Sequence, residues 1–129
     1  MELCELDHIG IVTDDIKESA AFYCNVLNFK LIETREVDDM KIAYYTDGIT
    51  KLEFLEPNNK KNIQKGIKHI AYRCKNIDKY AESFINNGIK IVNNKVNEYK
   101  GMKYIFSQIS NDQGIELVEY KEEHEDVQR

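Results

Sequence analysis

The chain has 129 residues, of which 42% are hydrophobic and 32% charged, so we expect a soluble globular protein of one domain or two small modules. Its formal net charge of −5 argues against nucleic acid as a partner, because phosphate binding needs a basic face. No apolar run approaches the ~18 residues that span a bilayer, and no signal peptide is visible, so we expect no membrane partner.

The first half of the chain predicts the order strand, helix and three strands. Residues from Glu5 to Thr13 alternate in polarity, as strands do. Asp15 and Glu18 then have the spacing of a helix capping box. An apolar stripe with helical spacing follows, made of Ile16, Ala20, Tyr23 and Leu27. The helix is expected to end near Asn28. Strands are expected at 29–36, 41–46 and 50–56, with a turn at Asp47-Gly48.

The second half predicts the same order. A strand is expected at 67–74, and Asn76 takes the helix-capping position before a stripe of Ile77, Ala81 and Phe84. Gly88 is a suitable residue to follow the helix. Strands are expected at 89–94, 103–109 and 114–120, with turns at 95–101 and 111–114.

An internal repeat therefore organises the chain. His69 follows His8 by 61 residues, and Asn76 follows Asp15 by the same distance. We predict a first module over residues 1–57, a linker over 58–66, a second module over 67–120 and a charged tail over 121–129.

A histidine and a glutamate recur in register within this repeat. Glu53 follows His8 by 45 residues and Glu116 follows His69 by 47, each inside strand-like sequence. A glutamate within an apolar strand is costly to bury unless it is paired or bound to metal. Taken singly, each residue has a structural explanation, but the repeated pair predicts a metal site. Two imidazoles and two carboxylates suit Ni²⁺, Co²⁺ or Zn²⁺, with Mn²⁺ or Fe²⁺ as further possibilities.

The cysteines point to a reducing compartment. The chain has an odd number of cysteines and no C-x-x-C spacing, which disfavours a disulfide framework or a zinc-thiolate site. The three residues are Cys4, Cys24 and Cys74. We expect a cytoplasmic protein whose cysteines are small buried apolar residues.

The chain resembles the vicinal oxygen chelate superfamily, which includes glyoxalase I, methylmalonyl-CoA epimerase, extradiol dioxygenases and bleomycin-binding proteins. The matching segments lie at residues 6–11, 22–27, 52–57, 69–71 and 115–119. The resemblance implies an α+β fold, in which two tandem βαβββ modules form a curled eight-stranded mixed sheet around a metal cup with the helices outside. It also implies a small-molecule substrate and a homodimer, with sites made within one chain or across two.

By position, His8, Glu53, His69 and Glu116 match the metal ligands of glyoxalase I. The resemblance then implies a lactoylglutathione lyase-like isomerase that acts through an enediolate on a hemithioacetal of methylglyoxal. Glu53 and Glu116 would be the acid and base as well as ligands, with Glu116 the principal base. Arg73 shares the face of His69 and is a candidate to bind an anionic substrate group.

Some positions depart from the glutathione-dependent pattern. Val12 stands where an arginine is common, and Asn28 stands where a glycine follows the first helix. One alternative is an epimerase of the methylmalonyl-CoA type, although the linker over residues 58–66 is short for it. The other is a non-catalytic ligand-binding module of the bleomycin-resistance type, which would hold no metal.

Overall fold

The computed structural model describes residues 4–110 and 113–121. These residues form two compact units, one over His8–Lys68 and the other over residues 4–7 together with 69 onward. Each half of the chain follows the order strand, helix and three strands, so the prediction of tandem βαβββ modules is confirmed. None of the helices in the described ranges is long and apolar enough to cross a membrane.

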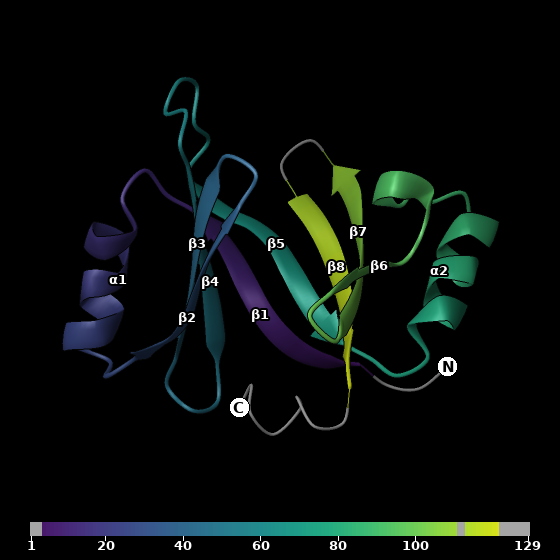
Figure 1. Ribbon diagram of the computed structural model, residues 1–129, viewed down its shortest axis with the longest axis horizontal. Helices are drawn as coiled ribbons and strands as arrows, with labels where there is room; N and C mark the ends of the chain where they lie inside the picture. The colour runs from purple at the N-terminus through teal and green to yellow at the C-terminus, as the bar shows by residue number, and fades with distance from the viewer. Residues whose placement is uncertain (1–3, 111–112, 122–129) are drawn as a thin grey trace. The chain divides into compact units, whose positions relative to one another are not determined.

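The first module has a mixed four-stranded sheet with the order β2-β3-β4-β1. Its β1 pairs in parallel with β4, whereas β2, β3 and β4 pair as antiparallel neighbours. Figure 1 shows α1 beside this sheet. The elements in chain order are β1 (Glu5–Val12), α1 (Ile16–Asn25), β2 (Lys30–Val37), β3 (Met40–Thr46) and β4 (Lys51–Pro57).

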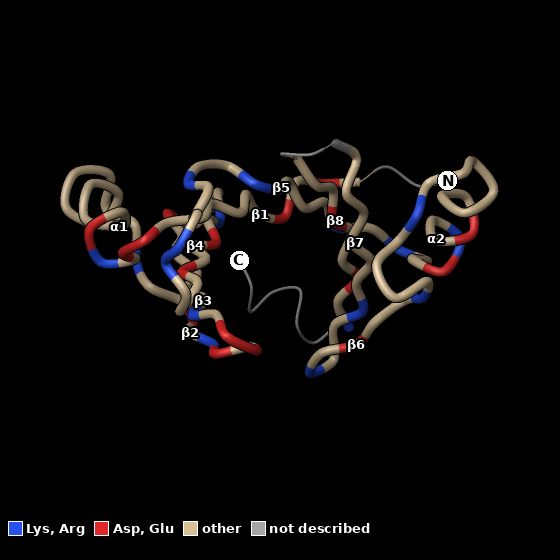
Figure 2. The backbone as a smooth tube through the Cα atoms, turned by 90° about the horizontal axis from the view of Figure 1, so that it is seen from above, with Lys and Arg blue, Asp and Glu red and all other residues tan. Residues whose placement is uncertain are grey.

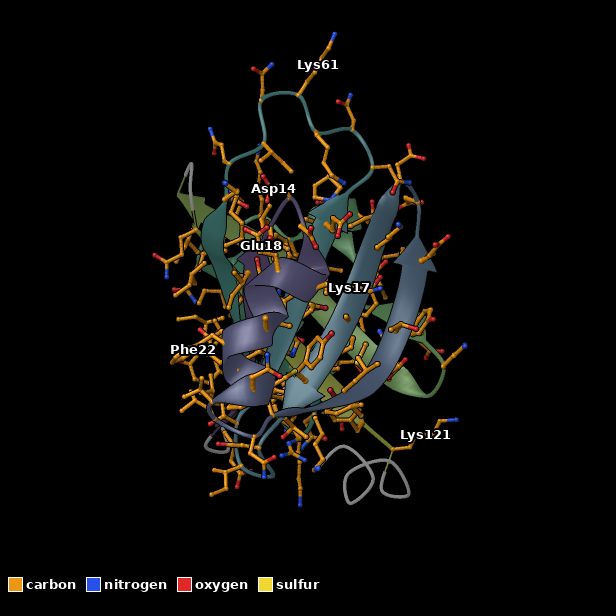
Figure 3. All side chains as sticks on the ribbon, turned by 90° about the vertical axis from the view of Figure 1, so that its left-hand side faces the viewer. Asp14, Lys17, Glu18, Phe22, Lys61 and Lys121 are labelled. Atoms are coloured by element: carbon orange, nitrogen blue, oxygen red, sulfur yellow. The ribbon has the colours of Figure 1, made fainter. Side chains whose placement is uncertain are left out.

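The core of this module lies between α1 and the sheet. Ala20 of α1 is buried against Leu52 and Phe54 of β4, and Phe54 is only 1% exposed. Leu27, which we expected to be the last residue of the apolar stripe, is exposed. Phe29 is buried in this core instead. The left-handed Asn28 (φ 61°) lies between these two residues. Figure 3 shows the outer side of α1, where Phe22 projects away from the sheet.

The second module repeats the plan with the order β5-β8-β7-β6. Its β5 pairs in parallel with β8, and the remaining neighbours are antiparallel. The elements are β5 (Gly66–Arg73), α2 (Ile77–Asn86), a 3₁₀ turn η1 (Val92–Asn94), β6 (Asn97–Tyr99), β7 (Met102–Ser110) and β8 (Gln113–Tyr120). The core contains Ile77, Tyr80 and Ala81 of α2 with Ile105 and Leu117 of the sheet.

Cys74 belongs to the same core. It is a buried free thiol, whereas Cys4 and Cys24 are free thiols that are only partly buried, in contrast to the expectation that all three would be buried. Burial, with smaller contributions from Cys4 and Glu119, raises the pKa of the Cys74 thiol to about 12. Cys74 is therefore protonated at neutral pH and is not a nucleophile, as expected for a buried apolar residue.

One predicted strand was wrong. Residues 89–94 contain the 3₁₀ turn, and the edge strand β6 lies within the segment that we expected to be a turn. Asn93 (φ 64°) and Asn94 (φ 55°) are both left-handed, which a strand does not allow. The Ser107 hydroxyl donates to the Lys90 carbonyl at 2.6 Å and ties the segment to β7.

Several predictions lie outside the described residues. These are the absence of a signal sequence at residues 1–3, the turn at positions 111–112 and the charged tail from residue 122 onward.

The two helix starts differ from each other. In α1 the Glu18 N–H donates to the Asp15 carboxylate at 3.1 Å, as the capping pattern predicts. In α2 Asn76 occupies the expected N-cap position, but it is left-handed and its side chain makes no capping hydrogen bond. The Glu119 carboxylate of β8 instead accepts from the N–H groups of Asn76 (3.2 Å) and Ile77 (3.0 Å).

Charges of both signs are interspersed along each module. Figure 2 shows Lys or Arg together with Asp or Glu on α1 and α2. Single strands can carry one sign alone: β1 and β8 have only acidic charges, and β5 has only basic ones. This distribution agrees with the alternation of acidic and basic residues in the sequence.

Candidate functional site

The first His–Glu pair joins two neighbouring parallel strands. His8 of β1 and Glu53 of β4 lie next to each other because Gly10 is the register partner of Glu53, two residues beyond His8 on the same face. His8 is 4% exposed and Glu53 is 6% exposed. The His8 Nε2 atom is 3.5 Å from Glu53 Oε1.

The second pair has the same construction. His69 of β5 and Glu116 of β8 lie on neighbouring parallel strands, and Ala71 is the register partner of Glu116. The His69 Nε2 atom is 3.6 Å from Glu116 Oε1. His69 is buried, and the Glu116 side chain is mostly buried. Each module therefore places its predicted histidine beside its predicted glutamate.

Each pair also has an aromatic ring on the next strand. Tyr44 of β3 is the cross-strand partner of Glu53, and its ring meets the His8 ring edge-on at 5.8 Å. Phe106 of β7 is the partner of Glu116, and its ring meets His69 edge-on at 5.7 Å. The Tyr44 hydroxyl also donates a hydrogen bond to Glu53 Oε2.

The two pairs have the chemistry and spacing of metal ligands. Imidazole nitrogens and carboxylate oxygens lie about 2.0–2.2 Å from Zn²⁺ and similar ions. Two donors 3.5–3.6 Å apart can thus both reach one ion. The same separation is longer than a good hydrogen bond between a histidine and a carboxylate. Burial of these polar groups adds to the case, since metal binding offsets their desolvation.

Two cations flank the Tyr44 ring in the first module. The guanidinium carbon of Arg35 is 4.9 Å from the ring centroid, and the Lys51 ammonium is 5.5 Å from it. Lys51 is 6% exposed and shares the β4 face of Glu53. Arg35 also pairs with Glu33 at 2.6 Å. This face therefore combines a histidine, a carboxylate and two buried or half-buried positive charges.

Arg73, the predicted anion-binding residue, lies in a network of acidic and aromatic groups. It is 3.7 Å from the Glu5 carboxylate and 4.0 Å from that of Asp7, and its guanidinium lies over the Tyr120 ring at 5.9 Å. Its Nε atom is buried and has no hydrogen-bond partner among the residues that the structure describes. Tyr120 in turn donates to Asp7 at 2.9 Å.

Three residues of this face were not predicted from the sequence: Tyr44, Lys51 and Arg35. The repeat could have predicted Tyr44, because Phe106 follows it by 62 residues, which is within the range of the other repeat offsets. Lys51 had no such signal, since its repeat counterpart is Gly114 and a strand lysine is ordinarily exposed.

Comparison with known proteins agrees with this geometry. Residues 5–120 match the Glyoxalase/Bleomycin resistance protein/Dioxygenase superfamily. The uncharacterized protein YqjC of Bacillus subtilis is 29% identical over 97 residues, which cover 67% of this chain and 69% of that protein. The crystal structure of the hypothetical protein BH1468 from Bacillus halodurans C-125 has a TM-score of 0.79 and 28% identity, covering 94% of this chain and 97% of that one.

Enzymes of known activity share the fold. A variant of Streptomyces coelicolor methylmalonyl-CoA epimerase, in complex with 2-nitronate-propionyl-CoA, has a TM-score of 0.77 and 22% identity. The match covers 94% of this chain and 97% of that one. At this identity the likeness concerns the fold alone. The family match spans nearly the whole chain, and the chain therefore belongs to the Glyoxalase/Bleomycin resistance protein/Dioxygenase superfamily.

Proposed function

We propose that this chain is a metal-dependent isomerase that moves a proton on a carbon next to a carbonyl group. The observation that carries the proposal is the His–Glu pair, which each module repeats on the same two strands at 3.5 and 3.6 Å. In this proposal His8, Glu53, His69 and Glu116 bind one divalent ion, with one pair from each module. The two pairs come from one chain or from two copies in a homodimer.

The chemistry needs a base beside an acidified C–H bond. A divalent ion held by these residues supplies a Lewis acid that stabilises negative charge on the substrate oxygen. With a hemithioacetal, Glu116 accepts the proton from the substrate carbon, and either Glu116 or Glu53 returns a proton to the adjacent carbon. Ni²⁺, Co²⁺ and Zn²⁺ suit this mixed set of nitrogen and oxygen donors, followed by Mn²⁺ and Fe²⁺.

The first candidate substrate is a hemithioacetal of methylglyoxal, as in glyoxalase I. A glutamate at position 53 favours it, because it completes a set of two histidines and two glutamates. A thiol other than glutathione is also a candidate co-substrate, since Val12 stands where an arginine is common in glutathione-dependent relatives. Arg73 is a candidate to bind an anionic group of the thiol, which would compete with the carboxylates of Glu5 and Asp7 for its guanidinium.

The second candidate is an acyl-CoA thioester that carries a carboxylate, as in methylmalonyl-CoA epimerase. It is supported by the epimerase neighbours among solved structures and by the positive charges of Arg35 and Lys51 beside the Glu53 face. The lysines of the loop before β5 and of β5 itself give this candidate less support, because most of them already have partners. Lys60 pairs with Glu56 at 3.0 Å, Lys65 is 3.5 Å from Asp14, and Lys68 donates to Gln64 at 3.3 Å. Lys61 projects from the tip of this loop (Figure 3).

Elemental analysis followed by two assays tests the proposal. The purified protein should carry divalent metal, and the His8→Ala variant should carry less, whereas a variant of the exposed Glu82, Glu82→Gln, should match wild type. Hemithioacetals of glutathione and other thiols are then compared with a methylmalonyl thioester, each with added Ni²⁺, Co²⁺ or Zn²⁺. Turnover of one substrate class selects that candidate. A protein that takes up no metal and turns over neither class is instead a ligand-binding module of the bleomycin-resistance kind.

Two further expectations belong to the proposal. A cytoplasmic location fits the three free thiols. A homodimer is tested by sedimentation equilibrium with and without metal, because a site shared between copies should make dimerisation depend on the metal.

A further inference from the structure

Tyr44 contacts both proposed metal ligands of the first module. The residue is 7% exposed. Its hydroxyl donates to Glu53 Oε2, and its ring meets the His8 ring edge-on at an interplanar angle of 85°. The face of the ring is occupied by the cations of Arg35 and Lys51. These contacts hold the ring from several sides, so the position of the hydroxyl is well determined.

The hydrogen bond distinguishes the two oxygens of Glu53. Oε2 receives the Tyr44 hydroxyl, while Oε1 faces His8 Nε2 at 3.5 Å. Rotation of the carboxylate would exchange the two oxygens and break the bond from Tyr44. The bond therefore presents one particular oxygen of Glu53 beside His8, as a ligand that binds through a single oxygen requires.

The second module has no such donor at the equivalent place. Phe106 occupies the position of Tyr44, with the same cross-strand relation to the glutamate and the same edge-on contact with the histidine. A phenyl ring carries no hydroxyl, so Glu116 cannot receive the bond that Glu53 receives. Phe106 lies instead over Gly114, the counterpart of Lys51, where an added Cβ would come within 2.3 Å of the ring.

We propose that Tyr44 is a positioning residue that fixes Glu53 as a single-oxygen metal ligand and leaves proton transfer to Glu116. This inference rests on the proposed function, because it assigns different tasks to two carboxylates that the repeat makes formally equivalent. In this inference, the hydroxyl that Tyr44 has and Phe106 lacks gives Glu53 and Glu116 their different tasks. Hydrogen-bonded partners of metal ligands commonly orient the ligand and set metal affinity in this way.

The test uses the variant Tyr44→Phe and binding of Co²⁺ to the whole chain. This change removes one oxygen and leaves the ring against His8, so the fold should persist, which circular dichroism checks. We expect Co²⁺ to bind about tenfold or more weakly than in wild type. We also expect the visible absorption band of bound Co²⁺ to shift, because that band reports ligand geometry and would not respond to a merely structural role.

Tyr120→Phe is the matched control. It removes another tyrosine-to-carboxylate hydrogen bond, the one to Asp7, which is not one of the four proposed ligands. We expect its Co²⁺ affinity and spectrum to equal those of wild type. The inference is overturned if Tyr44→Phe binds Co²⁺ with unchanged affinity and spectrum, or if Tyr120→Phe weakens binding equally.

A second pair of variants separates this inference from the proposed function. If wild type binds Co²⁺ and both His8→Ala and Glu53→Gln reduce binding, the proposed ligands stand and the result for Tyr44→Phe decides the inference alone. If neither change affects Co²⁺ binding, the ligand assignment itself fails and the role of Tyr44 fails with it.

Discussion

Glu56 caps a helix that begins forty residues before it in the sequence. Its Oε1 atom accepts the backbone N–H of Ile16, the first residue of α1, at 2.9 Å. Glu119 does the same for Ile77 at the start of α2, at 3.0 Å. Each glutamate lies three residues after the glutamate of a His–Glu pair, so the last strand of each module serves both its helix and its candidate site.

Loss of this cap should destabilise the fold. A carboxylate at a helix N-terminus satisfies exposed N–H groups and interacts favourably with the helix dipole. We expect Glu56→Ala to lower the free energy of unfolding by about 1 kcal/mol, measured by urea denaturation. The ion pair of Glu56 with Lys60 contributes little by comparison, so Lys60→Ala should cost less than about 0.5 kcal/mol. Equal costs for the two variants would assign the effect to the ion pair.

The same contact should make stability depend on pH. The hydrogen bond from Ile16, with help from Lys60, holds the pKa of Glu56 below its ordinary value of 4.5. A lowered pKa in the folded state contributes stability above the ordinary pKa, and this is lost as the pH falls through the folded value. We therefore expect wild type to exceed Glu56→Gln in unfolding free energy at neutral pH, with the difference shrinking below about pH 4.5. A difference that is constant across this range would contradict the prediction.

Most of the fold was predictable because its signals are local or repeated. The alternation of strands, the spacing of Asp15 and Glu18 and the left-handed positions at Asn28 and Gly88 each depend on a few neighbouring residues. The repeat then gave the topology, because two halves with the same order of elements predict the same module twice. Within each module, the pairing of His8 with Glu53 and of His69 with Glu116 followed from strand faces.

The remaining features depend on contacts distant in the sequence. Asn76 has the residue type of a helix cap, but the capping carboxylate belongs to Glu119, which lies 43 residues beyond it in the sequence. The prediction of a strand at 89–94 was wrong because Asn93 and Asn94 adopt left-handed conformations at the end of this segment. The burial of Lys51 depends on the Tyr44 ring of the neighbouring strand, which no local pattern of β4 reveals.

Replacement of Glu116 should remove the activity and leave the structure. Glu116→Gln keeps the size of the side chain and an oxygen, but an amide cannot accept the proton from the substrate carbon. We expect isomerase turnover to fall by at least about 100-fold on whichever substrate class is active. Circular dichroism should be unchanged, and Glu82→Gln on the exposed face of α2 serves as the control for charge. Full activity of Glu116→Gln would exclude it as the base.

The contact between Gly114 and Phe106 supplies the last prediction. A Cβ at position 114 would lie 2.3 Å from Cζ of Phe106 and 2.9 Å from Cε1, so Gly114→Ala must displace the ring that lies against His69. Overpacking of this kind typically costs about 1–3 kcal/mol. We expect that loss in urea denaturation of Gly114→Ala, and a smaller loss when the change is made in a Phe106→Leu background, where the ring is absent. Additive effects of the two changes would show that the ring does not cause the cost, because residues in contact should couple in a double-mutant cycle.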